Sequence, residues 1–119
     1  MARAAQLEAS ISSHLIAGDT EIIPLDGEFD SSNAPDLERR LSAALGDEPT
    51  DVLVDLRGVS FFDSTAMMTL RRGLTQARRR GIGFALIRPN PLVWRVFVLT
   101  GMSDNFLTYA SISEALTEQ

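Results

Sequence analysis

The run from Asp51 to Leu56 is the segment that most constrains the fold of this chain. A short run rich in valine and leucine is typical of a central strand that is covered on both faces. An amphipathic stretch from about Ser64 to Arg80 follows, and its apolar positions recur at helical spacing. A buried strand followed by such a helix favours an α/β domain. The predicted core stripe of this helix consists of Ala66, Met67, Leu70, Leu74 and Ala77.

The segments before Asp51 predict a hairpin and one helix. Residues 10–17 and Glu21 to Leu25 are two apolar-rich strands around a turn at Gly18-Asp19-Thr20. Ser32 or Asn33 is the expected N-cap of the helix, Pro35 fits its first turn, and Gly46 ends it. The core positions expected on this helix are Leu37, Leu41, Ala44 and Leu45.

The segments after the second helix continue the alternation. A strand ending at Ile87, a third helix from Pro91 to Gly101, a strand from Phe106 to Tyr109 and a helix from Ile112 to Leu116 are expected. We therefore predict a mostly parallel central sheet of about five strands with an N-terminal β-hairpin and about four helices.

The third predicted helix is almost entirely apolar. Two residues off its expected core face, Trp94 and Val98, are four positions apart. We favour core or partial burial for this pair, and the alternative is a second interface such as a homodimer. The residues available to the core are Leu92, Val93, Val96, Phe97 and Leu99.

Length and composition bound the class of protein. A chain of 119 residues with 45% apolar and 23% charged residues is expected to form one globular domain, with its core at about residues 10–118 and a flexible or loosely packed stretch at 1–9. The net charge of −5 argues against nucleic-acid binding, and the apolar runs are too short to span a membrane. Cysteine is absent, which excludes disulfides and fits a cytoplasmic protein.

The best candidate site is the acid-hydroxyl turn Asp63-Ser64-Thr65 at the start of the second helix. Asp30 follows the preceding strand, so the turns at Asp30 and Asp63 meet at one sheet edge if the two strands are neighbours. The alternative is that Asp30, Asp63 and Ser64 only cap helices. A Ser-His-Asp hydrolase is disfavoured because nothing directs His14, the one histidine, toward Ser64. Two aspartates beside arginine-rich helices make a weak metal site, so no metal or cofactor is expected.

The segment from Asp55 to Ala66, Asp-Leu-Arg-Gly-Val-Ser-Phe-Phe-Asp-Ser-Thr-Ala, resembles the signature of STAS domains, and most closely that of bacterial anti-sigma factor antagonists. Gly27-Glu28-Phe29-Asp30 is similar to the Gly-Glu-Leu-Asp segment of that family. Arg79-Arg80-Gly81 and the frame of Pro91, Phe97 and Gly101 also match. The likeness covers about residues 10 to 118.

The resemblance implies a non-enzymatic switch. In such antagonists the first hydroxyl of the motif, here Ser64, is phosphorylated by the partner anti-sigma factor, an ATP-dependent serine kinase. The unphosphorylated antagonist binds this kinase and releases the sigma factor, and a serine phosphatase reverses the block. The matching residues Asp30 and Asp63 are expected to contact the kinase or orient toward it.

This chain departs from the family pattern at two positions. Ala66 replaces the usual glycine, and Met68 stands where many relatives have a small residue. Met68 lies off the core stripe, so we expect it to be exposed and to touch a partner, with an ordinary surface residue as the alternative. The expected partner contacts are Asp30, Asp63, Ser64, Thr65 and Met68.

Other functions use the same fold. One is a STAS scaffold or accessory subunit of another complex, such as a lipid-transport ATPase, without phosphoryl transfer. Another is an antagonist that responds to a bound nucleotide or lipid, since a thiol redox signal is excluded without cysteine.

Overall fold

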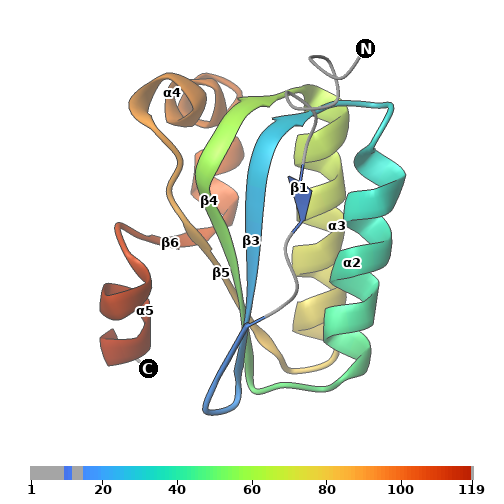
Figure 1. Ribbon diagram of the computed structural model, residues 1–119, viewed down its shortest axis with the longest axis vertical. Coiled ribbons are helices and arrows are strands. Elements are labelled where there is room, and N and C mark those ends of the chain that lie inside the picture. Colours follow the sequence, from blue (N-terminus) through green and yellow to red (C-terminus); the bar gives the residue numbers. More distant parts are fainter. Residues whose placement is uncertain (1–9, 12–14, 119) are drawn as a thin grey trace.

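A computed structural model describes residues 10, 11 and 15–118 (Figure 1). The expectations for residues 1–9 and for His14 lie outside these described residues.

The sheet is mixed, as predicted. β3 (Thr20–Phe29), β4 (Asp51–Phe62), β5 (Gly83–Ile87) and β6 (Leu107–Tyr109) are parallel neighbours in that order. The short strands β1 (Ser10–Ile11) and β2 (Leu15–Ala17) both pair antiparallel with β3, and β2 and β3 form the predicted hairpin.

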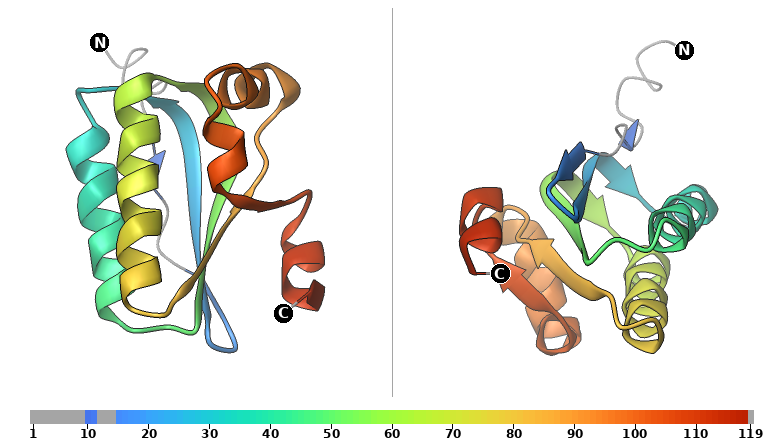
Figure 2. Two further views of the ribbon diagram at one scale, coloured as in Figure 1. Left: turned by 180° about the vertical axis from the view of Figure 1, so that it is seen from behind. Right: turned by 90° about the horizontal axis from the view of Figure 1, so that it is seen from below.

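Helices cover both faces of the sheet, as expected for parallel strands. α2 (Ala34–Gly46) and α3 (Ser64–Arg79) lie side by side on one face, and α5 (Ile112–Glu118) lies on the other (Figures 1 and 2). α4 (Pro91–Leu99) lies over the end of the sheet where β3 and β4 terminate, and the 3₁₀ turn η1 (Met102–Asn105) follows it.

Two groups of buried side chains form the core. The larger group contains every core position predicted for α2 and α3, and these positions are no more than 6% exposed. The smaller group joins Ile22, Leu53 and Ile87 of the sheet to Ala115 of α5. The sheet is therefore buried on both sides, which confirms the interpretation of the Asp51 to Leu56 run.

Strands β3 and β4 are longer than predicted. The strand predicted to end at Leu56 continues to Phe62 as β4, and the strand predicted to end at Leu25 continues to Phe29 as β3. The register shifts between Pro24 and Asp26 and again between Gly27 and Glu28. Such irregularities bend a strand without ending it. Gly58 pairs with Asp26 at this bend, where a Cβ would lie 3.0 Å from the Leu25 carbonyl oxygen.

The prediction for α4 is wrong at three core positions. Only Val93 and Phe97 are buried, whereas Leu92, Val96 and Leu99 are 79%, 41% and 73% exposed. A helix at the end of a sheet buries only the side that contacts the strands, so its other apolar residues face solvent. Trp94 is partly buried and stacks on Phe97 with ring centroids 5.5 Å apart, as favoured, but Val98 is exposed.

No helix within residues 15–118 combines the length and the hydropathy that a membrane span requires.

Two leucine-to-alanine variants test the assignment of the core. Leu70 is fully buried in α3, so Leu70→Ala should lower the free energy of unfolding by about 2–5 kcal/mol. Leu99 is exposed, so Leu99→Ala should change it by less than about 0.5 kcal/mol. Urea denaturation followed by circular dichroism measures both. Equal losses in the two variants would contradict the placement of α4.

Candidate functional site

The site begins where two parallel strands end together. Phe29 at the end of β3 pairs with Phe62 at the end of β4, and the Asp63 N–H donates to the Phe29 carbonyl at 3.1 Å. Asp30 and Asp63 follow directly, so their turns leave the sheet side by side. This confirms the prediction that both turns lie at the same edge.

Asp63 caps α3. Its backbone is extended, and its Oδ1 accepts from the Ala66 N–H at 2.9 Å. The alternative that Ser64 also serves as a cap is wrong for α3, because Ser64 is the first helical residue and follows the cap. Ser64 is exposed, and among the described residues its hydroxyl has no hydrogen-bond partner. The hydroxyl is therefore open to a reagent from solvent.

The Asp30 turn is fixed by its own hydrogen bonds. Asp30 Oδ1 accepts from the Ser32 N–H at 2.9 Å and from Ser32 Oγ at 2.6 Å. These bonds stabilise the charged carboxylate and hold the pKa of Asp30 below its ordinary value. Asn33 is the N-cap residue of α2, but its side chain makes no capping bond. Its side-chain oxygen Oδ1 instead accepts from the Asp30 N–H, and its Nδ2 donates to the Glu28 carbonyl, each at 2.9 Å.

The two departures from the family pattern leave Ser64 accessible. Ala66 is fully buried and points into the core, so its methyl group does not cover the hydroxyl. Met68 is 42% exposed, as expected, and lies one helical turn after Ser64. Thr65 is also exposed. Asp63, Ser64, Thr65 and Met68 therefore gather at the start of α3, beside Asp30.

Asp55, the first residue of the signature, lies away from this cluster. Its carboxylate accepts from Arg57 Nε at 3.0 Å and Arg57 Nη2 at 2.9 Å. The ion pair raises the pKa of the Arg57 guanidinium above its ordinary value. Asp55 therefore bonds within β4, just before Gly58.

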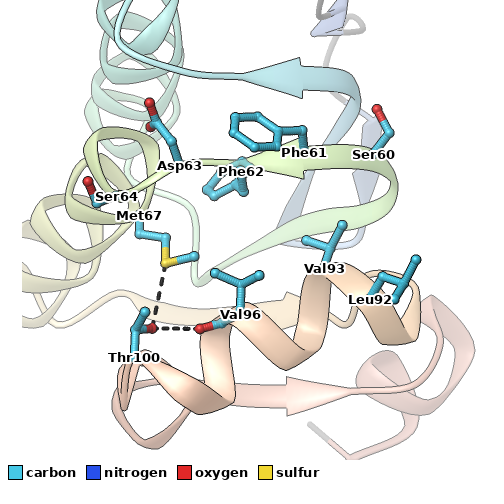
Figure 3. A pocket seen from close by; sticks show the side chains of 10 residues that line it. All are labelled: Ser60, Phe61, Phe62, Asp63, Ser64, Met67, Leu92, Val93, Val96 and Thr100. Carbon is cyan, nitrogen blue, oxygen red and sulfur yellow. Dashed lines mark hydrogen bonds between the residues drawn. The ribbon is translucent and has the colours of Figure 1, made fainter.

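A pocket of about 410 Å³ opens next to Ser64. The end of β4 and the start of α3 form one wall, and α4 forms the other (Figure 3). Asp63, Ser64 and Thr100 lie toward one end, where Thr100 Oγ1 donates to the Val96 carbonyl at 2.8 Å. None of the ten lining residues is basic. The apolar lining residues are Phe61, Phe62, Met67, Leu92, Val93 and Val96.

Sequence reasoning missed this pocket because it assigned Leu92 and Val96 to the core. The available signal was the apolar composition of α4 on more than one side. Among the described residues there is no cluster of three or more acidic, histidine or cysteine side chains that could hold a metal.

Known proteins resemble this chain in sequence and in structure. The STAS domain family model matches residues 13–115. The chain is 24% identical over 96 residues to the anti-sigma-F factor antagonist RsfB of Mycobacterium tuberculosis. The matched region covers 81% of this chain and 78% of RsfB.

Solved structures share the fold. An anti-sigma factor antagonist from Mycobacterium paratuberculosis matches with a TM-score of 0.84 at 25% identity, over 93% of both chains. Unphosphorylated SpoIIAA matches with a TM-score of 0.75 at 20% identity, over 93% of this chain and 95% of SpoIIAA. The phosphorylated form of SpoIIAA from Bacillus matches with a TM-score of 0.68, over 93% and 98% of the two chains.

Alanine substitutions should distinguish the cap from the exposed hydroxyl. Asp63→Ala removes the acceptor of the Ala66 N–H and should lower the free energy of unfolding by about 1 kcal/mol. Ser64→Ala removes a hydroxyl that makes no hydrogen bond among the described residues, so stability should be nearly unchanged. Thermal and urea unfolding measure the difference, and the reverse order would show that Ser64 is the cap.

The pKa of Asp30 should depend on Ser32. Ser32→Ala removes the hydroxyl donor to the charged carboxylate, so the pKa of Asp30 should rise toward its ordinary value. Because the folded-state pKa is lowered, the associated stability is present above the unfolded-state pKa and lost as pH falls through the folded-state pKa. Carboxyl ¹³C NMR titration measures the shift, and Ser31→Ala is the matched control. An equal pKa in all three proteins would rule out this hydrogen bond.

Proposed function

This chain belongs to the STAS domain family, and from that premise we propose that it is an anti-sigma factor antagonist without enzymatic activity of its own. In its unphosphorylated form it binds an anti-sigma factor that is an ATP-binding serine kinase, and the sigma factor is released. Phosphorylation of Ser64 ends this binding, and a serine phosphatase restores it. The proposed site of action is the cytoplasm.

The observation that carries the proposal is the exposed hydroxyl of Ser64 on the first residue of α3. In the proposed reaction, Ser64 Oγ forms a bond to the γ-phosphorus of ATP. The bond from that phosphorus to the bridging oxygen breaks, ADP leaves, and the hydroxyl proton passes to a base supplied by the kinase. An outward-pointing hydroxyl meets the first requirement of this transfer, which is access.

The domain can accommodate phosphorylated Ser64 without unfolding. A helix start carries a partial positive charge and is a favourable place for a phosphate. α3 has sixteen residues, and its first turn contains no acidic side chain after the Asp63 cap. The phosphorylated form of SpoIIAA keeps the same fold at a TM-score of 0.68 to this chain, which supports the same tolerance here.

Phosphorylation would change the charge of a small surface. Phosphorylation adds about −1.5 to −2 charges beside the carboxylates of Asp30 and Asp63. A partner surface fitted to a neutral hydroxyl and two carboxylates would meet excess negative charge. A coupling of about 1–3 kcal/mol corresponds to a loss of affinity of about fivefold to 150-fold.

The proposed contact surface contains the residues around this hydroxyl. Thr65 and Met68 are exposed on the same end of α3, and Met68 offers a deformable apolar contact. The similarity to RsfB, an anti-sigma-F factor antagonist, supports a partner of the anti-sigma class. The proposed contact residues are Asp30, Asp63, Ser64, Thr65 and Met68.

Phosphorylation in vitro tests the proposal. The protein is incubated with an anti-sigma kinase from the same genome and Mg-ATP, and the modified residue is located by mass spectrometry. We expect one phosphate on Ser64, none on Ser64→Ala, and normal phosphorylation of the neighbouring hydroxyl variant Thr65→Ala. The kinase should bind phosphorylated protein and Ser64→Glu at least tenfold more weakly than wild type.

Two results would contradict this function. One is phosphorylation that persists in Ser64→Ala. The other is a kinase affinity that is equal for wild type, Ser64→Glu and the phosphorylated protein.

A further inference from the structure

α4 presents an exposed apolar stripe to solvent. Leu92, Val96 and Leu99 are separated by four and three positions and therefore share one side of the helix. They are 79%, 41% and 73% exposed, and Arg95 is the single charged residue of this helix. Aliphatic side chains arranged in a row on the surface mark an interaction site more often than scattered ones do.

This stripe continues into the pocket beside Ser64. Leu92 and Val96 line the pocket, while Leu99 lies beyond it on the same side of α4. Phe61, 49% exposed, also lines the pocket, from the end of β4. The apolar surface therefore extends beyond the pocket, which favours a protein partner over a small molecule that would fill the pocket alone.

We propose that the pocket holds one large apolar side chain of the anti-sigma kinase, and that a phosphate on Ser64 weakens binding chiefly by keeping this side chain out. This inference rests on the proposed function and assigns the mechanism of its switch. The partner is a protein segment with a leucine, methionine or phenylalanine anchor, and a basic residue next to the anchor faces Asp30 and Asp63.

The size and lining of the pocket support an apolar anchor. A pocket of about 410 Å³ has room for several waters against its apolar walls. Their release on insertion of a side chain favours binding. No lining residue supplies a positive charge, whereas Asp63 supplies a negative one, so the complementary charge belongs to the partner.

The position of Ser64 links the pocket to phosphorylation. Ser64 is itself a lining residue, at the same end of the pocket as Asp63. A phosphate there carries a hydration shell, and burying it against an apolar side chain is costly. The modified residue would therefore close the anchor site while the free hydroxyl leaves it open.

Two valines on α4 provide a matched test. Val96 lines the pocket, and Val98 lies outside it, yet both are exposed, at 41% and 51%. Val96→Asn and Val98→Asn add the same polar group without adding charge. Isothermal titration with the kinase gives the dissociation constant of each variant, with Ser64 free and phosphorylated, and circular dichroism confirms the fold.

We expect Val96→Asn to bind the kinase at least fivefold more weakly than wild type, and Val98→Asn to stay within twofold. We also expect phosphorylation to weaken binding by a smaller factor in Val96→Asn than in wild type, because the two changes disable the same contact. Phosphorylation should keep its full effect in Val98→Asn.

Other outcomes would overturn this inference, and they can be distinguished from a failure of the proposed function. Suppose that wild type is phosphorylated at Ser64 and then dissociates from the kinase, but the two valine variants bind the kinase with equal affinity. The pocket then holds no anchor side chain, and the proposed phosphorylation switch still stands. If phosphorylation weakens kinase binding by the same factor in wild type and in Val96→Asn, the anchor is also ruled out. A small molecule found in the pocket by native mass spectrometry of the purified protein would replace the partner side chain as its occupant. If wild type neither binds nor is phosphorylated, the proposed function itself fails.

Discussion

The parallel pairing of β3 and β4 up to their last residues is the constraint on which the site depends. Phe29 and Phe62 are register partners, and their rings lie 5.6 Å apart. Phe62 in turn lies 5.8 Å from Phe97 of α4. These three aromatic side chains join the ends of both strands to the helix beyond them. The turns at Asp30 and Asp63, and the wall of the pocket, are thereby held by one buried cluster.

The same arrangement explains why polar and apolar surfaces adjoin. The Asp63 N–H donates to the Phe29 carbonyl at the end of β3, and the start of α3, which the Asp63 carboxylate caps, presents Ser64 beside it. α4 buries only Val93 and Phe97 against the sheet end, so its remaining apolar residues stay exposed at the edge of the polar cluster. A partner that covers this surface can bury apolar side chains and contact Ser64 at the same time, so its affinity depends on whether Ser64 carries a phosphate.

The sequence was sufficient for the features that depend on local pattern. The order of strands and helices, the core stripe of α3 and the meeting of Asp30 with Asp63 follow from apolar periodicity and from parallel pairing. The cap of α3 was harder to assign, because it depends on which of two neighbouring residues, Asp63 or Ser64, has extended backbone. The full length of β4 also depends on a neighbour, since pairing with β3 carries it through Gly58 to Phe62.

The exposed side of α4 was not predictable for a different reason. Leu92, Val96 and Leu99 have the composition of core residues, and only the position of α4 at the sheet end leaves them facing solvent. The pocket depends on the same placement, because its two walls come from segments about thirty residues apart in the sequence.

Mapping the contact surface by NMR tests the central claim most directly. Amide and methyl shifts of the labelled protein are recorded as the unlabelled anti-sigma kinase is added, before and after phosphorylation of Ser64. We predict shifts concentrated at Asp30, at Asp63 to Met68 and at Leu92, Val96 and Leu99, and their loss after phosphorylation. Shifts concentrated on α5 and β6, or a surface that phosphorylation leaves unchanged, would contradict the claim.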